Sequence, residues 1–279
     1  MNTIVTAILL FLLTGATPII AQSEVKEQLV VPLTDPGKPG FMDVGLINGF
    51  IHVVGYNGKD IVIDASSDVN RRSRSDDRPS ASRNGESGMK RIPTGNALDV
   101  SAEERNNRVT VNASSHSKPV NLTIKVPQRF SLKLHTINQG DITVENVSGE
   151  LEINNVNGPI ELTNIGGSAV ANTINGDLKA TFRDIDSKAP MAFSTLNGRV
   201  DVTFPNSAKA NLKMKTDRGD IFSDFDIDVE KAQPKASRSS QSGMYRVTIE
   251  DWVYGKINGG GPEVMMKSMQ GSIYVRKSK

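Results

Sequence analysis

Apolar residues in the middle of the chain recur at fixed distances from regularly spaced glycines. Around Gly149 they lie two residues before and two and four residues after the glycine, and the same positions are apolar around Gly158 and Gly176. The glycines that carry this pattern follow one another at intervals of nine residues: Gly140, Gly149, Gly158, Gly167 and Gly176. Because so short a unit cannot bury its own apolar face, we expect successive copies to stack and share one core. The pattern therefore predicts an all-β repeat protein.

Asn-Gly pairs mark the predicted turns between units, at Asn157, Asn175, Asn197 and Asn258. The same pair is a strong signal for two-residue hairpins, so an antiparallel all-β arrangement is the alternative. The apolar residues keep the same distances from the glycine in every unit, and each unit has about five extended residues. Both features favour coils that all run in one direction. Stacked coils also let asparagine side chains hydrogen-bond from one coil to the next. We predict a single-chain parallel β-solenoid, similar to a β-helix or β-roll, with short strands and Asn-Gly turns.

The interval between glycines lengthens beyond Gly176, because the next glycines in phase are Gly198 and Gly219. Each of these longer intervals slightly exceeds two nine-residue units, which indicates one complete coil whose intermediate turn lacks glycine. In the narrower part, Ala169 and Ala171 replace large aliphatic residues. Aromatic residues in the longer coils are expected to fill a larger section: Phe182, Phe193, Phe204 and Phe222 or Phe225. The solenoid is therefore predicted to widen towards the C-terminus.

Two polar segments interrupt the predicted strands, at about 68–91 and 230–243. Segments with so few apolar residues cannot offset the entropy cost of ordering, so we predict that both are mobile insertions. Arg71, Arg72 and Arg74 in the first insertion allow two interpretations, a solvated loop or an anion-binding patch.

The last predicted strands cover residues 263–269 and 271–275, and Arg276, Lys277 and Lys279 follow them. An unpaired strand at the end of a sheet is a site for association with other molecules, and charged residues oppose that association. We expect these three residues to protect an open edge.

An apolar run at residues 4–13, broken only by Thr6, predicts a signal peptide. A run of ten residues is too short to span a bilayer but fits the apolar core of a signal, and Ala21 is a suitable last residue before cleavage. No Lys or Arg precedes the run, so an uncleaved anchor or a buried helix is the alternative. We expect residues 1–21 to be removed and residues 22–279 to form a single β-solenoid domain.

The amino-acid composition limits the cellular locations and the classes of partner that we expect. The chain has no cysteine, so we expect neither disulfides nor a lipid attached to cysteine. No second apolar stretch reaches spanning length, so no transmembrane segment is expected after signal cleavage. The predicted localisation is exported: periplasmic, at the cell surface or secreted. The 33 basic and 31 acidic residues nearly balance, which gives no case for a nucleic-acid partner.

Metal-binding residues are sought among the histidines and the acidic residues. His52, His116 and His135 lack the spacing of metal ligands and are expected on the surface or on strand faces. Four acids alternate with apolar residues at Asp224, Asp226, Asp228 and Glu230. On one strand these acids would share a face that attracts a hard cation such as calcium, although the same alternation is typical of any half-exposed strand. We predict no metal site.

Catalytic motifs are missing from the sequence: it contains no nucleophile elbow, phosphate-binding loop or zinc-protease motif. Glu152 and Glu161 lie nine residues apart, at the outward position between two apolar residues. As a catalytic pair their carboxylates would have to lie roughly 5–10 Å apart. We predict a non-enzymatic protein with no catalytic, cofactor-binding or metal-binding residue and no cofactor. A carbohydrate-active lyase or hydrolase on a β-helix scaffold is the alternative.

The repeat motif, an aliphatic residue followed by Asn-Gly and an alternating strand, is carried by INGDLKATF, LNGRVDVTFP and INQGDITVENVSGELEI. With VNLTIKVP before these segments and EDWVYGKINGGGPEVMMKSMQGSIYVRK at the end, the chain closely resembles a bacterial putative-adhesin family of exported proteins of unknown function, common in Bacteroidetes-type bacteria. The resemblance runs from about residue 42 to 279. It implies a β-solenoid-like fold and an envelope or surface location, and it brings no catalytic residues. The partners that remain open are an envelope protein, a glycan or a surface, bound in an adhesin-like or structural role.

Overall fold

Strands make up every regular element of the described chain. The computed structural model describes residues 25–67, 98–113, 119–138, 140–230, 235–241 and 244–279. Within these ranges the chain forms strands β1 to β22 and no helix, which confirms the all-β prediction. The predicted signal peptide at 1–21, the insertion at 68–91 with its arginines, and His116 lie outside the described residues.

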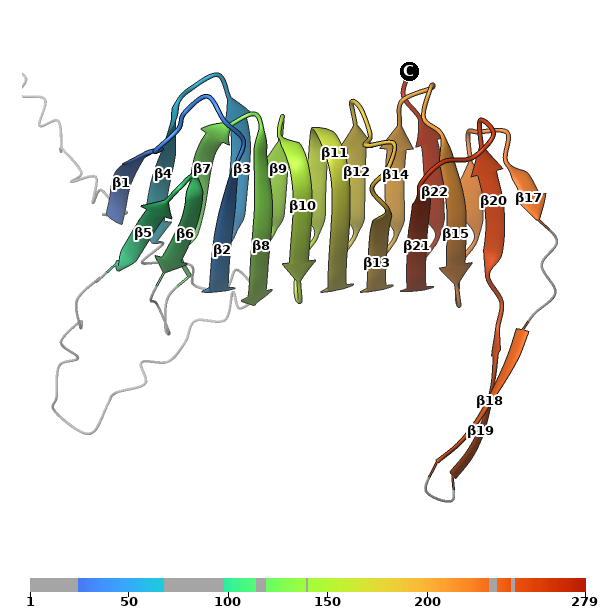
Figure 1. The fold of residues 1–279 in the computed structure, drawn as a ribbon. Coiled ribbons are helices and arrows are strands. Elements are labelled where there is room, and N and C mark those ends of the chain that lie inside the picture. Colours follow the sequence, from blue (N-terminus) through green and yellow to red (C-terminus); the bar gives the residue numbers. More distant parts are fainter. Residues whose placement is uncertain (1–24, 68–97, 114–118, 139, 231–234, 242–243) are drawn as a thin grey trace, which may run out of the picture.

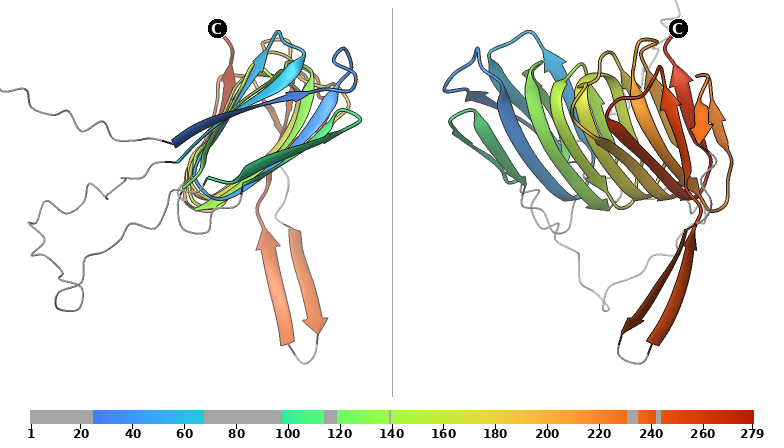
Figure 2. Two further views of the ribbon diagram at one scale, coloured as in Figure 1. Left: turned by 90° about the vertical axis from the view of Figure 1, so that its left-hand side faces the viewer. Right: turned by 45° about the vertical axis from the view of Figure 1, so that its right-hand side comes forward.

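The strands lie on two long faces, here called sheet A and sheet B (Figure 1). Sheet A contains, in spatial order, β1 (Val25–Pro32), β4 (Asp60–Ser67), β7 (Asn121–Pro127), β3 (Ile51–Tyr56), β9 (Ile142–Glu145), the first part of β11 (Ile160–Asn175), β12 (Leu178–Phe182), β14 (Val200–Phe204), β22 (Ile273–Lys277) and β16 (Ile221–Ser223). Sheet B contains β5 (Val100–Arg105), β6 (Arg108–Ala113), β2 (Gly40–Asn48), β8 (Phe130–Asn138), β10 (Ser148–Asn155), the second part of β11, β13 (Met191–Asn197), β21 (Glu263–Gln270), β15 (Ala210–Thr216), β20 (Val253–Ile257) and β17 (Asp228–Glu230). Seen along the long axis, the two sheets outline a flattened ring (Figure 2).

One coil consists of a strand of sheet B and the next strand of sheet A along the chain. The coils follow one another in space as β6–β7, β2–β3, β8–β9, β10–β11, β11–β12, β13–β14, β21–β22 and β15–β16. Ile160 pairs in parallel with Ile142 on one side and Leu178 on the other, each two nine-residue units away, and Leu178 pairs with Val200 in the next coil. The nine-residue unit is therefore half a coil, and the longer interval from Gly176 to Gly198 is a complete coil. The parallel arrangement predicted for the repeats is confirmed.

The order of coils departs from the order of the chain at both ends. At the C-terminal end, β22 pairs with β14 on one side and β16 on the other, so the last strands form an interior coil. The expectation that the coil of Gly219 follows that of Gly198, and that the chain ends at an open edge, is wrong. At the other end, β2–β3 lies between β6–β7 and β8–β9. Every coil presents the same apolar face, so the repeat pattern does not specify which coils become neighbours.

Antiparallel strands finish both ends of the solenoid. β1 pairs with β4 and β5 with β6 at the N-terminal end, and β20 and β17 follow β15 at the C-terminal end. β18 (Lys235–Gln241) and β19 (Met244–Glu250) pair only with each other, as a hairpin that projects from this end (Figure 1). Part of the predicted loop at 230–243 is therefore a strand, because the alternating residues of β19 give the polar segment a partner.

Two columns of glycine explain the nine-residue period, one at each edge of the flattened coil. A Cβ on Gly176 would lie 2.2 Å from the carbonyl oxygen of Gly158, and one on Gly167 would lie 2.4 Å from that of Gly149. At these turns the backbones of neighbouring coils approach too closely for any side chain. The column at the turn from sheet B to sheet A contains Gly49, Gly140, Gly158, Gly176, Gly198, Gly271 and Gly219.

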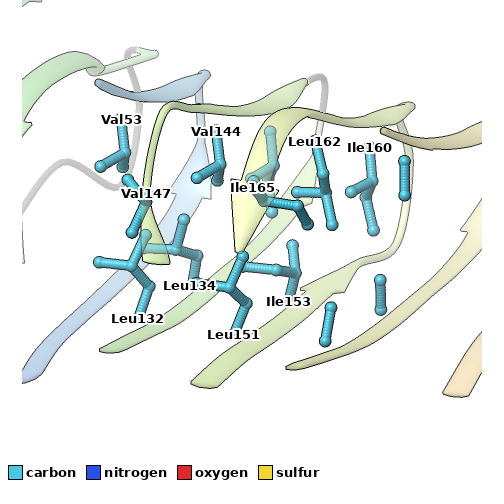
Figure 3. Packing of buried hydrophobic residues seen from close by; sticks show 14 of the residues in the cluster. Val53, Leu132, Leu134, Val144, Val147, Leu151, Ile153, Ile160, Leu162 and Ile165 are labelled. Carbon is cyan, nitrogen blue, oxygen red and sulfur yellow. The ribbon is translucent and has the colours of Figure 1, made fainter. Parts of the chain in front are cut away.

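Inward side chains of both sheets meet in one continuous core (Figure 3). Leu151 and Ile153 point inward from sheet B, and Ile160 and Leu162 from sheet A. Further along, Phe182 packs against Phe193 and Phe204, with ring centroids 6.0 and 5.5 Å away, and the small residues Ala169 and Ala171 lie in the same coil as Phe182. Phe225 is also buried, whereas Phe222 is exposed and stacks on Tyr274. The predicted burial of Phe182, Phe193, Phe204 and Phe225 is thus confirmed.

A row of buried polar side chains lies beside the glycine column at the turn from sheet B to sheet A. Thr173 Oγ1 donates to the carbonyl of Gly158 at 2.9 Å, and Thr195 Oγ1 donates to that of Gly176 at 2.9 Å. Equivalent bonds are made by Thr136, Asn155, Ser268 and Thr216 to Gly49, Gly140, Gly198 and Gly271. Each coil is therefore linked to its neighbour at the turn by one side-chain bond that satisfies a buried carbonyl.

Candidate functional site

Outward side chains of sheet B form straight rows along the solenoid. Successive residues of a strand alternate between the two faces of a sheet, and parallel in-register strands place equivalent residues side by side. One row is aliphatic and is called here the aliphatic ridge: Ile47, Ile137, Val156, Ile174, Leu196 and Met269. Ile47, Ile174 and Met269 are 47%, 43% and 44% exposed, so the ridge lies open to solvent from the second coil to the seventh.

The aliphatic ridge was not expected from the sequence. The residue two before each glycine was grouped with the core positions, and at Gly149 this is correct because Val147 is fully buried. At the turn from sheet B to sheet A the equivalent residue, such as Ile174, points outward instead. The residue before it, Thr173, points inward. A small polar residue three before the glycine, as in Thr173 and Thr195, is the signal that distinguishes the two turns.

An asparagine ladder lies directly beside the ridge. Asn175 Nδ2 donates to Asn157 Oδ1 at 2.8 Å, and Asn197 Nδ2 donates to Asn175 Oδ1 at 2.6 Å. The row begins where Asn157 Nδ2 donates to the carbonyl of Ile137 at 3.2 Å. The expected bonding of asparagines between coils is therefore present, and it fixes the backbone that carries the ridge.

On its other side, the ridge is bordered by a second polar row, here called the polar track. Its members are His135, Asn154, Asn172, Ser194, Lys267 and Lys215. Asn172 Nδ2 donates to Asn154 Oδ1 at 3.2 Å, and Ser194 Oγ donates to Asn172 Oδ1 at 2.6 Å. Each of these amides keeps further hydrogen-bonding capacity for an outside group.

The polar track ends in a cationic patch, defined here as Lys213, Lys215, Lys267, Trp252 and Tyr254. Lys213 Nζ lies 4.7 Å from the centroid of the Trp252 ring and Lys215 Nζ lies 5.9 Å from it, which are cation–π contacts. Tyr254 pairs with Lys213 across β20 and β15. A cavity of about 450 Å³ adjoins the patch, and its lining includes Lys215 together with Asp217, Asp220 and Asp251. Aromatic and cationic groups therefore gather at one end of the track.

Several side chains on the outer face of sheet A are paired with one another. Lys179 Nζ lies 2.8 Å from Glu161 Oε1, and His52 Nε2 lies 3.0 Å from Glu145 Oε1. Arg276 Nε lies 2.7 Å from Asp201 Oδ1, and this hydrogen bond raises the pKa of the guanidinium. Salt bridges of this kind leave little charge available for a partner.

The two carboxylates considered as a catalytic pair lie on opposite faces. Glu152 points outward from sheet B and lies 3.0 Å from Lys133 Nζ. Glu161 points outward from sheet A and is paired with Lys179. The hypothesis of a Glu152–Glu161 site is wrong, because consecutive half-coils belong to different sheets and the core lies between them.

The four alternating acids do not share a strand face. β16 ends at Ser223 and β17 begins at Asp228, so Asp224 and Asp226 lie in the connection between them. His52 is on the outer face of sheet A and His135 on that of sheet B. Across the ranges that the structure describes, no group of His, Asp and Glu residues is arranged to hold a metal ion.

A family model matches the part of the chain that contains the repeats. Residues 128–251 match the family model described as Toastrack DUF4097, and no curated protein matches the chain. A solved structure of a putative cell adhesion protein from Clostridium sporogenes ATCC 15579 is 12% identical, with a TM-score of 0.49 over 92% of this chain and 100% of that chain. A putative adhesin (BF0245) from Bacteroides fragilis NCTC 9343 is 12% identical, with a TM-score of 0.37 over 92% of this chain and 98% of that chain.

No helix with the length and apolar character needed to cross a membrane occurs in the described ranges.

The family match begins just before β8 and ends just after β19, so it covers the coils that carry the repeat motifs. It confirms the resemblance predicted from those motifs, and the family to which residues 128–251 are similar is Toastrack DUF4097.

Proposed function

We propose that the protein is an exported, non-enzymatic, adhesin-like β-solenoid that binds a surface partner through the outer face of sheet B. The aliphatic ridge is the observation that carries this proposal. Five of its members, Ile47, Ile137, Ile174, Leu196 and Met269, are between 41% and 47% exposed. Contiguous exposed apolar surface bordered by polar residues is typical of interaction sites.

The expected partner is extended and lies along the solenoid axis. Each coil adds one residue to the ridge and one to the polar track, at a spacing of about 4.8 Å per coil. Over the coils that carry the track the surface is therefore about 24 Å long. Solenoids bind extended partners on such repeated surfaces. The classes of partner that fit are an envelope protein, a glycan or another cell surface.

The non-enzymatic part of the proposal is supported by the separation of Glu152 and Glu161 on opposite faces. The alternative, a lyase or hydrolase, needs a general acid and a second carboxylate about 5–10 Å apart. Product release from any member of a polysaccharide panel would favour the alternative. We propose no catalytic, cofactor-binding or metal-binding residue.

Export and domain organisation belong to the same proposal. Residues 1–21 are proposed to be a cleaved signal, and 22–279 a single domain with insertions at 68–91 and 230–243. The Asn-Gly turns and the widening of the coils towards the C-terminus stay predictions. Fractionation of the native host followed by N-terminal sequencing checks the cleavage after Ala21 and the location outside the cytoplasm.

Substitutions on the ridge test the binding surface. Ile174→Lys with Leu196→Lys places two charges in the middle of the ridge, and Thr163→Lys places one on the outer face of sheet A, where Thr163 is exposed. We expect at least about tenfold weaker binding of the ridge variant to immobilised envelope preparations of the host, and unchanged binding of the control. Equal binding by all three proteins contradicts the proposed surface. Circular dichroism spectra establish that each variant is folded.

A further inference from the structure

The cationic patch contains two like charges on neighbouring strands, and one of the two has a carboxylate close by. Lys215 and Lys267 are direct neighbours on the parallel strands β15 and β21. Like charges at opposed positions of a sheet destabilise it. Asp217 Oδ1 lies 3.7 Å from Lys215 Nζ. An anionic ligand at this position would relieve the repulsion.

Two other lysines on strands of the repeat coils, Lys133 and Lys179, contrast with this arrangement. Lys133 is paired with Glu152 at 3.0 Å and Lys179 with Glu161 at 2.8 Å. In those coils an acid occupies the neighbouring register position. At the patch, the register position beside Lys215 holds Lys267, and the one beside Lys213 holds Met265. On β21, therefore, no acid occupies the register position beside Lys213 or Lys215.

Two aromatic side chains give the patch an apolar contact surface in addition to its positive charge. Trp252 and Tyr254 are both half-buried, and Trp252 is the only tryptophan of the chain. Such residues provide large amphipathic contact surfaces at a low cost in conformational entropy. A sugar ring offers apolar C–H groups to an aromatic ring and hydroxyl groups to amides, so it satisfies both kinds of group.

The patch is also continuous with the polar track. Asn154, Asn172 and Ser194 lead along the same row to Lys267 and Lys215. A linear ligand bound along this row would contact the amide groups of the asparagines and the hydroxyl group of Ser194. At the C-terminal end of the row it would contact the ammonium groups of the lysines. The chemistry that matches this order is a polymer that carries hydroxyl groups along its length together with carboxylates.

We propose that the polar track and the cationic patch bind an acidic polysaccharide, one that contains uronic acid residues, laid along the solenoid axis. This inference rests on the proposed binding role of the outer face of sheet B and names the class of its ligand. Lys213, Lys215 and Lys267 neutralise its carboxylates, Trp252 and Tyr254 contact sugar rings, and Asn154, Asn172 and Ser194 bind hydroxyl groups.

The test uses the full chain and immobilised polygalacturonate as the acidic probe. Dextran serves as the neutral polysaccharide, vesicles of phosphatidylglycerol and phosphatidylcholine as the anionic membrane, and oligothymidylate as the single-stranded nucleic acid. The variant is Lys213→Gln with Lys267→Gln. Its matched control is Lys179→Gln, which removes one exposed lysine from the outer face of sheet A.

We expect the wild-type protein to bind polygalacturonate and to bind dextran, vesicles and oligothymidylate at least about tenfold more weakly. The Lys213/Lys267 variant should lose at least about tenfold in affinity for polygalacturonate, and its affinity should depend less on salt. Trp252→Ala should weaken binding with no change in salt dependence. Lys179→Gln should bind as the wild type does.

Several outcomes overturn the inference: no binding to polygalacturonate, equal binding to dextran, stronger binding to vesicles or to oligothymidylate, or an equal loss in the Lys179 control. The ridge variant separates this failure from that of the proposed function. Ridge-dependent binding to envelope material without binding to polygalacturonate rejects only the acidic polysaccharide. Absence of both kinds of binding rejects the binding face as well.

Discussion

The hydroxyl group of Thr173 and the carbonyl group of Gly158 join two coils of the solenoid by a hydrogen bond of 2.9 Å. Thr173 is 5% exposed, and its equivalents in neighbouring coils make the same bond. Backbone ladders hold the strands of each sheet, whereas these bonds hold the turns between the sheets. They explain why a polar residue recurs inside an otherwise apolar core.

Replacement of Thr173 by valine tests the contribution of this bond. Valine has nearly the same shape but leaves the buried carbonyl of Gly158 without its partner, so we expect a loss of about 1–3 kcal/mol in the free energy of unfolding. Denaturation in urea measures the change. Thr163→Val, at an exposed position of sheet A, should change the stability by less than about 0.5 kcal/mol. Equal stability of the two variants would show that the inner bond contributes nothing.

Asn155 is an imperfect member of the same row. Its Nδ2 group donates to the carbonyl of Gly140 at 2.7 Å, but its Oδ1 atom is buried without a hydrogen-bond partner. Asn155→Thr keeps a donor of the kind that Thr173 provides and removes the unsatisfied oxygen. We expect the free energy of unfolding to rise by about 1 kcal/mol. A lower melting temperature in calorimetry would contradict this expectation.

The glycine column predicts a severe effect at Gly176. An alanine Cβ there would lie 2.2 Å from the carbonyl oxygen of Gly158, and the three nearest atoms are all backbone atoms of Gly158 and Pro159, which cannot move aside as a side chain can. We expect Gly176→Ala to cost about 3 kcal/mol. Gly37→Ala is the control, because no atom lies within 4 Å of the Cβ that it would add. Thermal unfolding monitored by circular dichroism compares the two, and similar melting temperatures would reject the close-approach explanation.

Removal of the last strands tests the interior position of the C-terminal coil. A chain that ends at Gly260 lacks β21 and β22, which separate β13 from β15 and β14 from β16. We expect loss of cooperative unfolding and the appearance of aggregates on size exclusion, because strand edges and the core around Phe193 become exposed. A soluble monomer that unfolds cooperatively would show that the coil is dispensable.

Stability at low pH should depend on Glu104. The backbone N–H groups of Asn107 and then Thr34 donate to its carboxylate and lower its pKa below the ordinary value of 4.5. These bonds therefore stabilise the fold fully above pH 4.5 and are lost as the pH falls through the lower pKa of the folded state. Glu104→Gln should make the melting temperature less dependent on pH in this acidic range. Parallel curves for the two proteins would contradict the role of Glu104.

The fold was largely predictable because its main constraint is local. Close backbone approach at each turn requires glycine, so positions such as Gly158 and Gly176 carry the period of the coil directly into the sequence. The order of coils was not predictable at the ends. Strands β14 and β22 both begin with buried residues at alternate positions, and pairing between backbones does not depend on which of them comes first.

The candidate binding surface was predictable only in part. The Asn-Gly motif identifies the asparagines, but Ile174 and Leu196 are aliphatic and in phase with the glycines, so the sequence does not distinguish them from core residues although both are exposed. The lysines of the cationic patch lie far apart in the sequence, as Lys215 and Lys267 show. Their contact arises from the interior position of the C-terminal coil, which the repeat pattern did not specify.

That interior position has a consequence for biosynthesis. The strands that complete the coil between β13–β14 and β15–β16 include residues 263–277, which leave the ribosome after every other strand of the solenoid. The coils therefore cannot form strictly in order from the N-terminus, because the coil between β13–β14 and β15–β16 forms only after these residues have been synthesised. Until then β13 and β15, and likewise β14 and β16, lack the strands that join them in the finished sheets.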